Sequence, residues 1–232
     1  MSNSKQVRKY DSSLTSYLLF LLIFCILPVV FSAKDGTGSI FYAGFPLFFS
    51  AASSMSCLIG SCDFVAEQME KRLDRRRYAD AAAVFFVCVK CALLQAGLAF
   101  LVFYAGSGLV GKVILGDAFT AAVLRFYVPA LAAMPLVGIF KGTLHGMGLE
   151  WQARLSLYLL SGLFLFSGLI FGLLWSGRGA KVGKLLRNDN MTYVYTACGL
   201  GIGISAAVIA VLLFTGVLVF AHLRGLQRSQ EY

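Results

Sequence analysis

Charged residues are scarce in this chain of 232 residues: they make up 13% of it, whereas soluble domains carry about 25%. Histidine occurs only twice and proline only four times. The sequence holds no HExxH, no GxSxG and no P-loop. We therefore expect no enzyme activity, no metal site and no bound cofactor.

Hydrophobic residues, in contrast, make up 59% of the chain, and the mean hydropathy is +0.79. This composition excludes a disordered chain, a collagen and a secreted disulfide scaffold, and it favours lipid as the solvent. Six continuous apolar windows are long enough to span a bilayer, and they lack the two-residue alternation of strands. The predicted fold is all-α: one polytopic domain over residues 1–232 with six transmembrane helices. The predicted spans are residues 14–31, 40–62, 81–104, 119–140, 155–175 and 193–222.

The formal net charge of +9 predicts an orientation, because Lys and Arg collect in the cytoplasmic connections of membrane proteins. With both termini in the cytoplasm, 12 Lys and Arg fall in the inner connections and 6 in the outer ones. A predicted outer loop at residues 176–190 holds four of those six. No basic face with interleaved aromatic residues occurs outside the spans, so nucleic acid is not an expected partner.

Six cysteines lie in apolar stretches, where a free thiol behaves as a small hydrophobic group. Cys88 and Cys91 form a CxxC sequence. The sequence provides no second CxxC and no nearby histidine, so we predict neither a zinc site nor a redox pair.

Motifs in the first half of the chain follow one another in an order typical of one transporter family. Residues 36–49 read GTGSIFYAGFPLFF and cover the start of the predicted span 40–62, and VAEQ follows that span at residues 65–68. A basic run follows, and YADA at residues 78–81 begins the third span.

The later spans continue this order. The fourth holds RFYVPAL at residues 125–131 and PLVGIFKGTLHGMG at residues 135–148, and the sixth holds YVYTACGLGIGISA at residues 193–206. Over residues 36–224 the chain resembles the multidrug/oligosaccharidyl-lipid/polysaccharide (MOP) exporter superfamily, nearest its stage V sporulation protein B-like flippases. The resemblance implies a bacterial plasma membrane protein with a MATE-like fold, in which two six-helix lobes surround a cavity.

Two departures from that family are visible. Six predicted spans make a single lobe, so a second lobe has to come from another copy or from a partner chain. Asp63 stands where the family often has a basic residue that could contact a lipid pyrophosphate.

Five ionisable residues are candidates for substrate binding, because burying a charge in hydrocarbon costs several kcal/mol. Lys90 lies deep in the third span and Arg125 near the outer start of the fourth; for both, snorkelling to the headgroups is the alternative. Lys141 and His145 share one face at the inner end of the fourth span, as a cationic rim for a lipid-linked phosphate or as a solvated helix end. Asp63 either binds substrate or caps or pairs with a basic neighbour.

Proline and glycine mark positions of bending and close packing. Prolines in or beside spans indicate either the broken helices of transporters or ordinary helix kinks. Gly199 and Gly203 form a GxxxG sequence that predicts close packing with another helix, with contact to a second lobe as the alternative. The four prolines are Pro28, Pro46, Pro129 and Pro135.

The favoured function is membrane transport, as a half-size or partial flippase for lipid-linked oligosaccharide or polysaccharide precursors. Membrane lipids and such a lipid-linked sugar are the expected partners. One alternative is a non-transporting helical subunit of a larger membrane complex. The other is a lobe of a multidrug or cation antiporter, which the cationic residues Lys90 and Arg125 disfavour.

Overall fold

The computed structural model describes residues 62–109 and 118–228, which form five α-helices. They are α3 (Cys62–Asp74), α4 (Tyr78–Leu109), α5 (Ala118–Gly146), α6 (Glu150–Leu186) and α7 (Asn190–Arg228). The predicted all-α class is confirmed for this part of the chain. It contains four helices long and apolar enough to cross a membrane, α4 to α7, rather than six. The predicted spans 14–31 and 40–62 lie outside the described residues, apart from Cys62.

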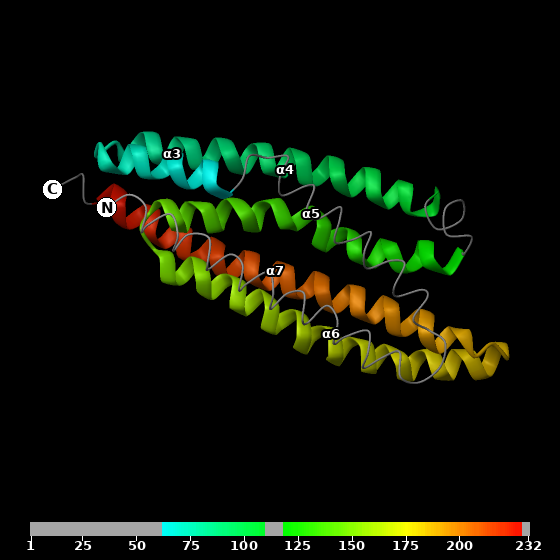
Figure 1. The fold of residues 1–232 in the computed structure, drawn as a ribbon. Coiled ribbons are helices and arrows are strands. Elements are labelled where there is room, and N and C mark those ends of the chain that lie inside the picture. Colours follow the sequence, from blue (N-terminus) through cyan, green and yellow to red (C-terminus); the bar gives the residue numbers. More distant parts are fainter. Residues whose placement is uncertain (1–61, 110–117, 229–232) are drawn as a thin grey trace, which may run out of the picture.

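The four long helices lie side by side in one row, in the order α4, α5, α7, α6 (Figure 1). The α6–α7 pair packs most extensively, followed by α5–α7 and α4–α5. The short helix α3 lies against α4 and α5. Helix α4 therefore forms one edge of the row and α6 the other.

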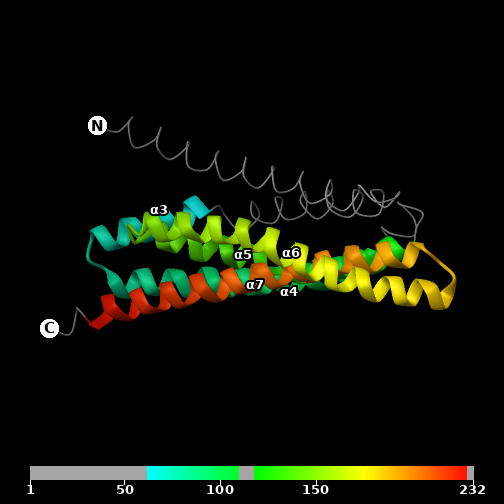
Figure 2. The same ribbon diagram turned by 90° about the horizontal axis from the view of Figure 1, so that it is seen from below.

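The turns of the row gather at two opposite ends (Figure 2). One end holds the α3–α4 and α5–α6 turns and the last residues of α7; we call it the α3–α4 end. The other holds the α6–α7 turn; we call it the α6–α7 end. The count of Lys and Arg predicts that the α3–α4 end faces the cytoplasm.

Each of the four long helices extends beyond the apolar window that predicted it. The predicted outer loop at residues 176–190 is wrong. Residues 176–186 continue α6 as helix, and only residues 187–189 make the turn to α7. A hydropathy window detects the part of a helix that lies in hydrocarbon, whereas Lys181 and Lys184 are good helix formers outside it. The basic segment is thus a helical hairpin end that reaches about 16 Å past Trp175.

Aromatic residues mark two levels along the row that fit the two surfaces of a bilayer. Tyr78 and Tyr104 are 26 positions apart on α4, and Trp151 and Trp175 are 24 apart on α6. At 1.5 Å per residue these separations are about 39 and 36 Å, close to a hydrocarbon core of about 30 Å with its interfaces. Tyr and Trp concentrate at such interfaces.

Apolar side chains between these levels point outward, as lipid requires. Leu94, Leu98 and Leu101 on α4 keep 77%, 67% and 69% of their surface exposed. Exposed apolar surface of this extent marks an interaction face, and here the partner is hydrocarbon. The four long apolar helices identify an integral membrane protein.

Glycines let the helix backbones of the row touch. A Cβ atom built on Gly203 of α7 would lie 2.6 Å from the carbonyl oxygen of Ser167 on α6, and one on Gly199 would collide with the carbonyl of Phe171. The hydroxyl of Ser167 donates to the carbonyl oxygen of Gly203 at 2.8 Å. The GxxxG sequence thus packs inside this chain, as predicted, and α6 occupies the face that the alternative gave to a second lobe.

We expect Gly203→Ala to lower the free energy of unfolding by about 1–3 kcal/mol, because the added methyl overpacks the α6–α7 contact. Gly162→Ala on α6 is the matched control, since a Cβ there meets nothing within 4 Å. This control should gain up to about 1 kcal/mol from helix propensity. Denaturant unfolding in detergent micelles measures both, and equal stabilities of the two variants would contradict the packing.

Candidate functional site

The structure distributes the five sequence-predicted residues over different depths and does not bring them into one cluster. Lys141 and His145 lie in the last two turns of α5, and Asp63 lies in the first turn of α3, which packs against that end of α5. Lys90 lies in the middle of α4, and Arg125 lies near the start of α5, toward the α6–α7 end. Between Arg125 and Lys141, α5 rises about 24 Å.

Two glycines on α5 hold α3 next to Lys141 and His145. A Cβ on Gly146 would lie 2.7 Å from the carbonyl oxygen of Ala66, and one on Gly142 would collide with the carbonyl of Cys62. Lys141 and His145 directly precede these glycines, and both are half-buried. Because Asp63 follows Cys62, this contact places Asp63 and Lys141 at the same level on neighbouring helices.

Lys90 lies at the depth of the bilayer centre on an outward face. It is 12 positions after Tyr78, or about 18 Å along a helix whose two aromatic levels are about 39 Å apart. Its side chain is exposed, and no ion pair among the described residues involves it. The lysine side chain is too short to bring its ammonium from this depth to either interface. Such an intramembrane charge is a functional-site candidate by default.

Arg125 joins the start of α5 to the end of α4. Its Nε donates to the Oγ of Ser107 at 3.1 Å, and its guanidinium carbon lies 5.3 Å from the ring centroid of Tyr104. A cation beside the last turn of α4 is also favoured by the helix dipole. For Arg125 the sequence predicts substrate binding, with snorkelling as the alternative, and it does not identify Ser107 and Tyr104 as partners.

Lys90 and the guanidinium of Arg125 share one face of α4. Arg125 Nη2 lies 3.8 Å from a Cβ built on Gly108. Gly108 follows Lys90 by 18 positions, which is five turns of 3.6 residues, so both positions point the same way. Ala83 precedes Lys90 by seven positions and lies only about 20° from this direction. We call the strip from Ala83 through Lys90 to Gly108 the α4 face.

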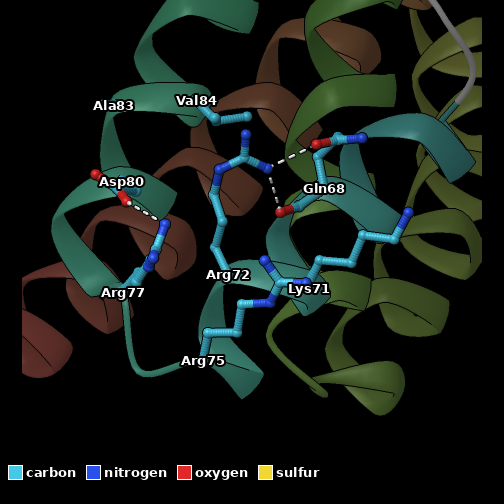
Figure 3. A pocket seen from close by; sticks show the side chains of 8 residues that line it. All are labelled: Gln68, Lys71, Arg72, Arg75, Arg77, Asp80, Ala83 and Val84. Atoms are coloured by element: carbon cyan, nitrogen blue, oxygen red, sulfur yellow. Dashed lines mark hydrogen bonds and ion pairs between the residues drawn. The ribbon is translucent and has the colours of Figure 1, made fainter.

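A polar pocket of about 440 Å³ begins this face at the α3–α4 end (Figure 3). It lies between the last turns of α3 and the first turns of α4, and cations predominate in its lining. The residues that line it are Gln68, Lys71, Arg72, Arg75, Arg77, Asp80, Ala83 and Val84. We call it the α3–α4 pocket.

Arg72 occupies the centre of the α3–α4 pocket, between Gln68 and Val84 (Figure 3). Its Nη1 donates to the main-chain oxygen of Gln68 at 2.9 Å and to the side-chain Oε1 at 2.6 Å. Lys71 pairs with Glu67 at 2.6 Å, and Arg77 pairs more loosely, at 4.0 Å, with Asp80, the one carboxylate among the described lining residues. The lining therefore has a surplus of positive charge.

The basic residues of this pocket are visible in the sequence, but only the α3–α4 turn brings them together. By themselves, positive residues next to a span predict only its orientation. The turn of three arginines after Asp74 folds α3 back against α4, and this brings cations from two helices together. The N–H groups of Arg76 and Arg77 donate to the carbonyls of Leu73 and Arg72, both at 2.9 Å, which closes the end of α3.

Among the described residues, no group of three His, Cys, Asp or Glu side chains could hold a metal ion. Cys88 and Cys91 both lie on α4 as free thiols, the first half-buried and the second exposed. The residues that this site offers to a ligand are basic side chains suited to anions.

The chain was compared with family models, curated proteins and solved structures, and none of them matches it. The resemblance to the MOP superfamily therefore stays a prediction from the motifs.

Arg76 tests the turn that builds the pocket, because its φ of 54° is left-handed. This conformation costs a non-glycine residue about 1–2 kcal/mol. We expect Arg76→Gly to raise the free energy of unfolding by about 1 kcal/mol after the entropy of the unfolded glycine is counted. Arg75→Gly removes the same charge at a position without positive φ and should bring no gain. A higher free energy of unfolding in both variants would mean that the removed charge, and not the left-handed backbone of Arg76, causes the gain.

The Arg125–Ser107 hydrogen bond predicts a measurable coupling between α4 and α5. We expect Arg125→Ala and Ser107→Ala to be non-additive by about 0.6 kcal/mol, the usual strength of such bonds in membranes. A double-mutant cycle on unfolding in micelles measures this energy. Arg178→Ala with Ser107→Ala is the control pair and should be additive. Additivity in the first cycle as well would contradict a stabilising Arg125–Ser107 hydrogen bond.

Proposed function

We propose that this chain is a membrane transport protein, a half-size or partial flippase for lipid-linked oligosaccharide or polysaccharide precursors. The observation that carries the proposal is the α4 face, which presents cations at three depths. The α3–α4 pocket lies at one end, Lys90 at the centre and Arg125 at the other end.

The chemistry of the cargo explains why cations at three depths favour this function. A pyrophosphate headgroup that crosses about 30 Å of hydrocarbon needs a positive partner on the way, because an unpaired charge there costs about 3 kcal/mol or more. Lys90 provides that partner at the depth where the cost is greatest. The lipid tail of the cargo stays in the bilayer, next to the exposed leucines of α4.

Helix α5 offers a place where the row could bend during transport. Pro129 and Pro135 lie inside α5, between Arg125 and Lys141. Each proline removes one backbone hydrogen bond, and transporters use such interrupted helices near their binding sites. Bending of α5 at these prolines would move its Arg125 and Lys141 ends relative to α4 and α7, which pack on α5.

The absence of acidic side chains from the described spans disfavours the cation antiporter. Between residues 81 and 109, and in α5, no Asp or Glu occurs, and in α6 and α7 the only one is Glu150 at the first position of α6. A carrier of cations needs carboxylates at membrane depth. An anionic cargo fits this composition, and a second lobe comes from another copy or a partner chain.

A non-transporting helical subunit is the second candidate, favoured by the filled centre of the row. Tyr127, Leu200 and Ile204 are almost fully buried in one apolar cluster of α5, α6 and α7. The pocket described above lies at the periphery, on α3 and α4. In this candidate Lys90 would pair with a partner helix in place of a moving headgroup.

Lys90→Met tests the transport proposal. We expect flipping of a fluorescent polyprenyl-pyrophosphate oligosaccharide in proteoliposomes to slow about a hundredfold, which corresponds to about 3 kcal/mol at the barrier. Lys184→Met, which removes a cation outside the membrane, is the matched control and should flip at the wild-type rate. Wild-type flipping by Lys90→Met would contradict the proposal. Wild-type protein that flips nothing, in a homodimer or with its partner, would favour the helical subunit.

A further inference from the structure

We infer that the α3–α4 pocket binds the phosphate of an anionic phospholipid of the surrounding leaflet. The site is the pocket that the transport proposal places at one end of the α4 face, but its occupant here is a bilayer component. Its test measures equilibrium binding and therefore succeeds or fails separately from flipping. The inference stands on the charge of the lining, on the depth of the pocket and on the apolar strip that leads from it.

The charge of the lining selects an anion. Lys71, Arg72, Arg75 and Arg77 line the pocket, and Asp80 is the one carboxylate among its described lining residues. Lys71 is paired with Glu67, so the surplus of positive charge lies on the arginines. Glu70 and Asp74, nearer the end of α3, are exposed and are not among the lining residues. Arg72 uses one terminal nitrogen for Gln68, so its other N–H donors are available to phosphate oxygens.

The depth of the pocket fits a lipid headgroup. Tyr78, which begins α4 directly after the arginine turn, marks the interface level of this end. Basic pockets between membrane helices on the cytoplasmic side are typical sites for anionic headgroups, and this end is the one that the charge count assigns to the cytoplasm.

An apolar strip continues from the pocket into the membrane, which selects a lipid over a soluble anion. Ala83 and Val84 line the membrane side of the pocket. Val87, Leu94 and Leu98 follow at helical spacing on the exposed side of α4. A phospholipid with its phosphate at Arg72 and Arg75 lays its acyl chains along this strip, whereas free phosphate makes no use of it.

Fluorescence anisotropy of the full chain in mild detergent tests the site. Phosphatidylglycerol and phosphatidylcholine with the same fluorescent acyl chain are the two probes. We expect the wild-type chain to bind phosphatidylglycerol at least about tenfold more tightly, since each basic residue near an anionic surface contributes about fivefold. Equal affinity for the two probes would overturn the inference.

Two charge-matched variants locate the binding. Arg72→Gln/Arg75→Gln/Arg77→Gln should weaken phosphatidylglycerol binding roughly fivefold per charge, until it equals that of phosphatidylcholine. Arg178→Gln/Lys181→Gln/Lys184→Gln removes three cations at the α6–α7 end and should leave the affinity within about twofold of wild type. An unchanged pocket variant, or an equal loss in both variants, would contradict the site.

Arg72 also holds Gln68, so the pocket variant could lose its local fold. Arg75→Gln/Arg77→Gln leaves Arg72 and its hydrogen bonds in place and should still weaken binding. Circular dichroism and elution volume check that each variant is folded. If this double variant binds as tightly as wild type, the pocket assignment fails.

Inorganic phosphate separates a lipid site from a phosphate site. Added at the ionic strength of a sodium chloride control, it should displace no more phosphatidylglycerol than chloride does. Displacement by phosphate well beyond the chloride control would show a site for free phosphate and refute the lipid assignment.

Discussion

Direct contact between helix backbones at glycines is the interaction on which this structure depends. Lipid tails are as apolar as leucine, so helices in a membrane associate through close packing and interhelical hydrogen bonds. Gly199 and Gly203 let α7 touch α6, and Gly142 and Gly146 let α5 touch α3. The hydroxyl of Ser205 adds a hydrogen bond from α7 to the carbonyl oxygen of Phe126 on α5, at 2.9 Å.

This packing decides which charges can meet a ligand. Helices α5 and α7 occupy the middle of the row and bury apolar side chains, while α4 forms an edge. The edge position exposes the α4 face and its Lys90. Contact between α3 and α5 holds α3 beside α4, so the arginine turn folds into a pocket and the basic residues become a site.

The sequence predicted what depends on composition and local pattern. Continuous apolar runs predicted the helical class and the four described spans, and Gly199 and Gly203 predicted their close contact. Helix ends were less predictable, because hydropathy detects only the part of a helix that lies in hydrocarbon. Helix α6 continues beyond that part through Lys181 and Lys184.

Contacts between residues far apart in the chain could not be predicted from the sequence. Nothing local shows that Arg125 binds Ser107, 18 positions earlier, or that Arg72 and Asp80 line one pocket. These contacts depend on how α4 rotates about its axis when it packs on α5. The candidate residues were visible as rare charges, but their depths and partners came only with the tertiary structure.

The central claim is that the α4 face crosses the membrane with Lys90 at its centre. Spin labels on single cysteines at residues 83, 90, 97 and 108, in a background without the native cysteines, measure this depth by collision with oxygen and with a water-soluble nickel complex. The account predicts the highest oxygen-to-nickel ratio at residue 90 or 97 and low ratios at 83 and 108. A ratio at residue 90 as low as that at residue 83 would place Lys90 in the interface and contradict the account.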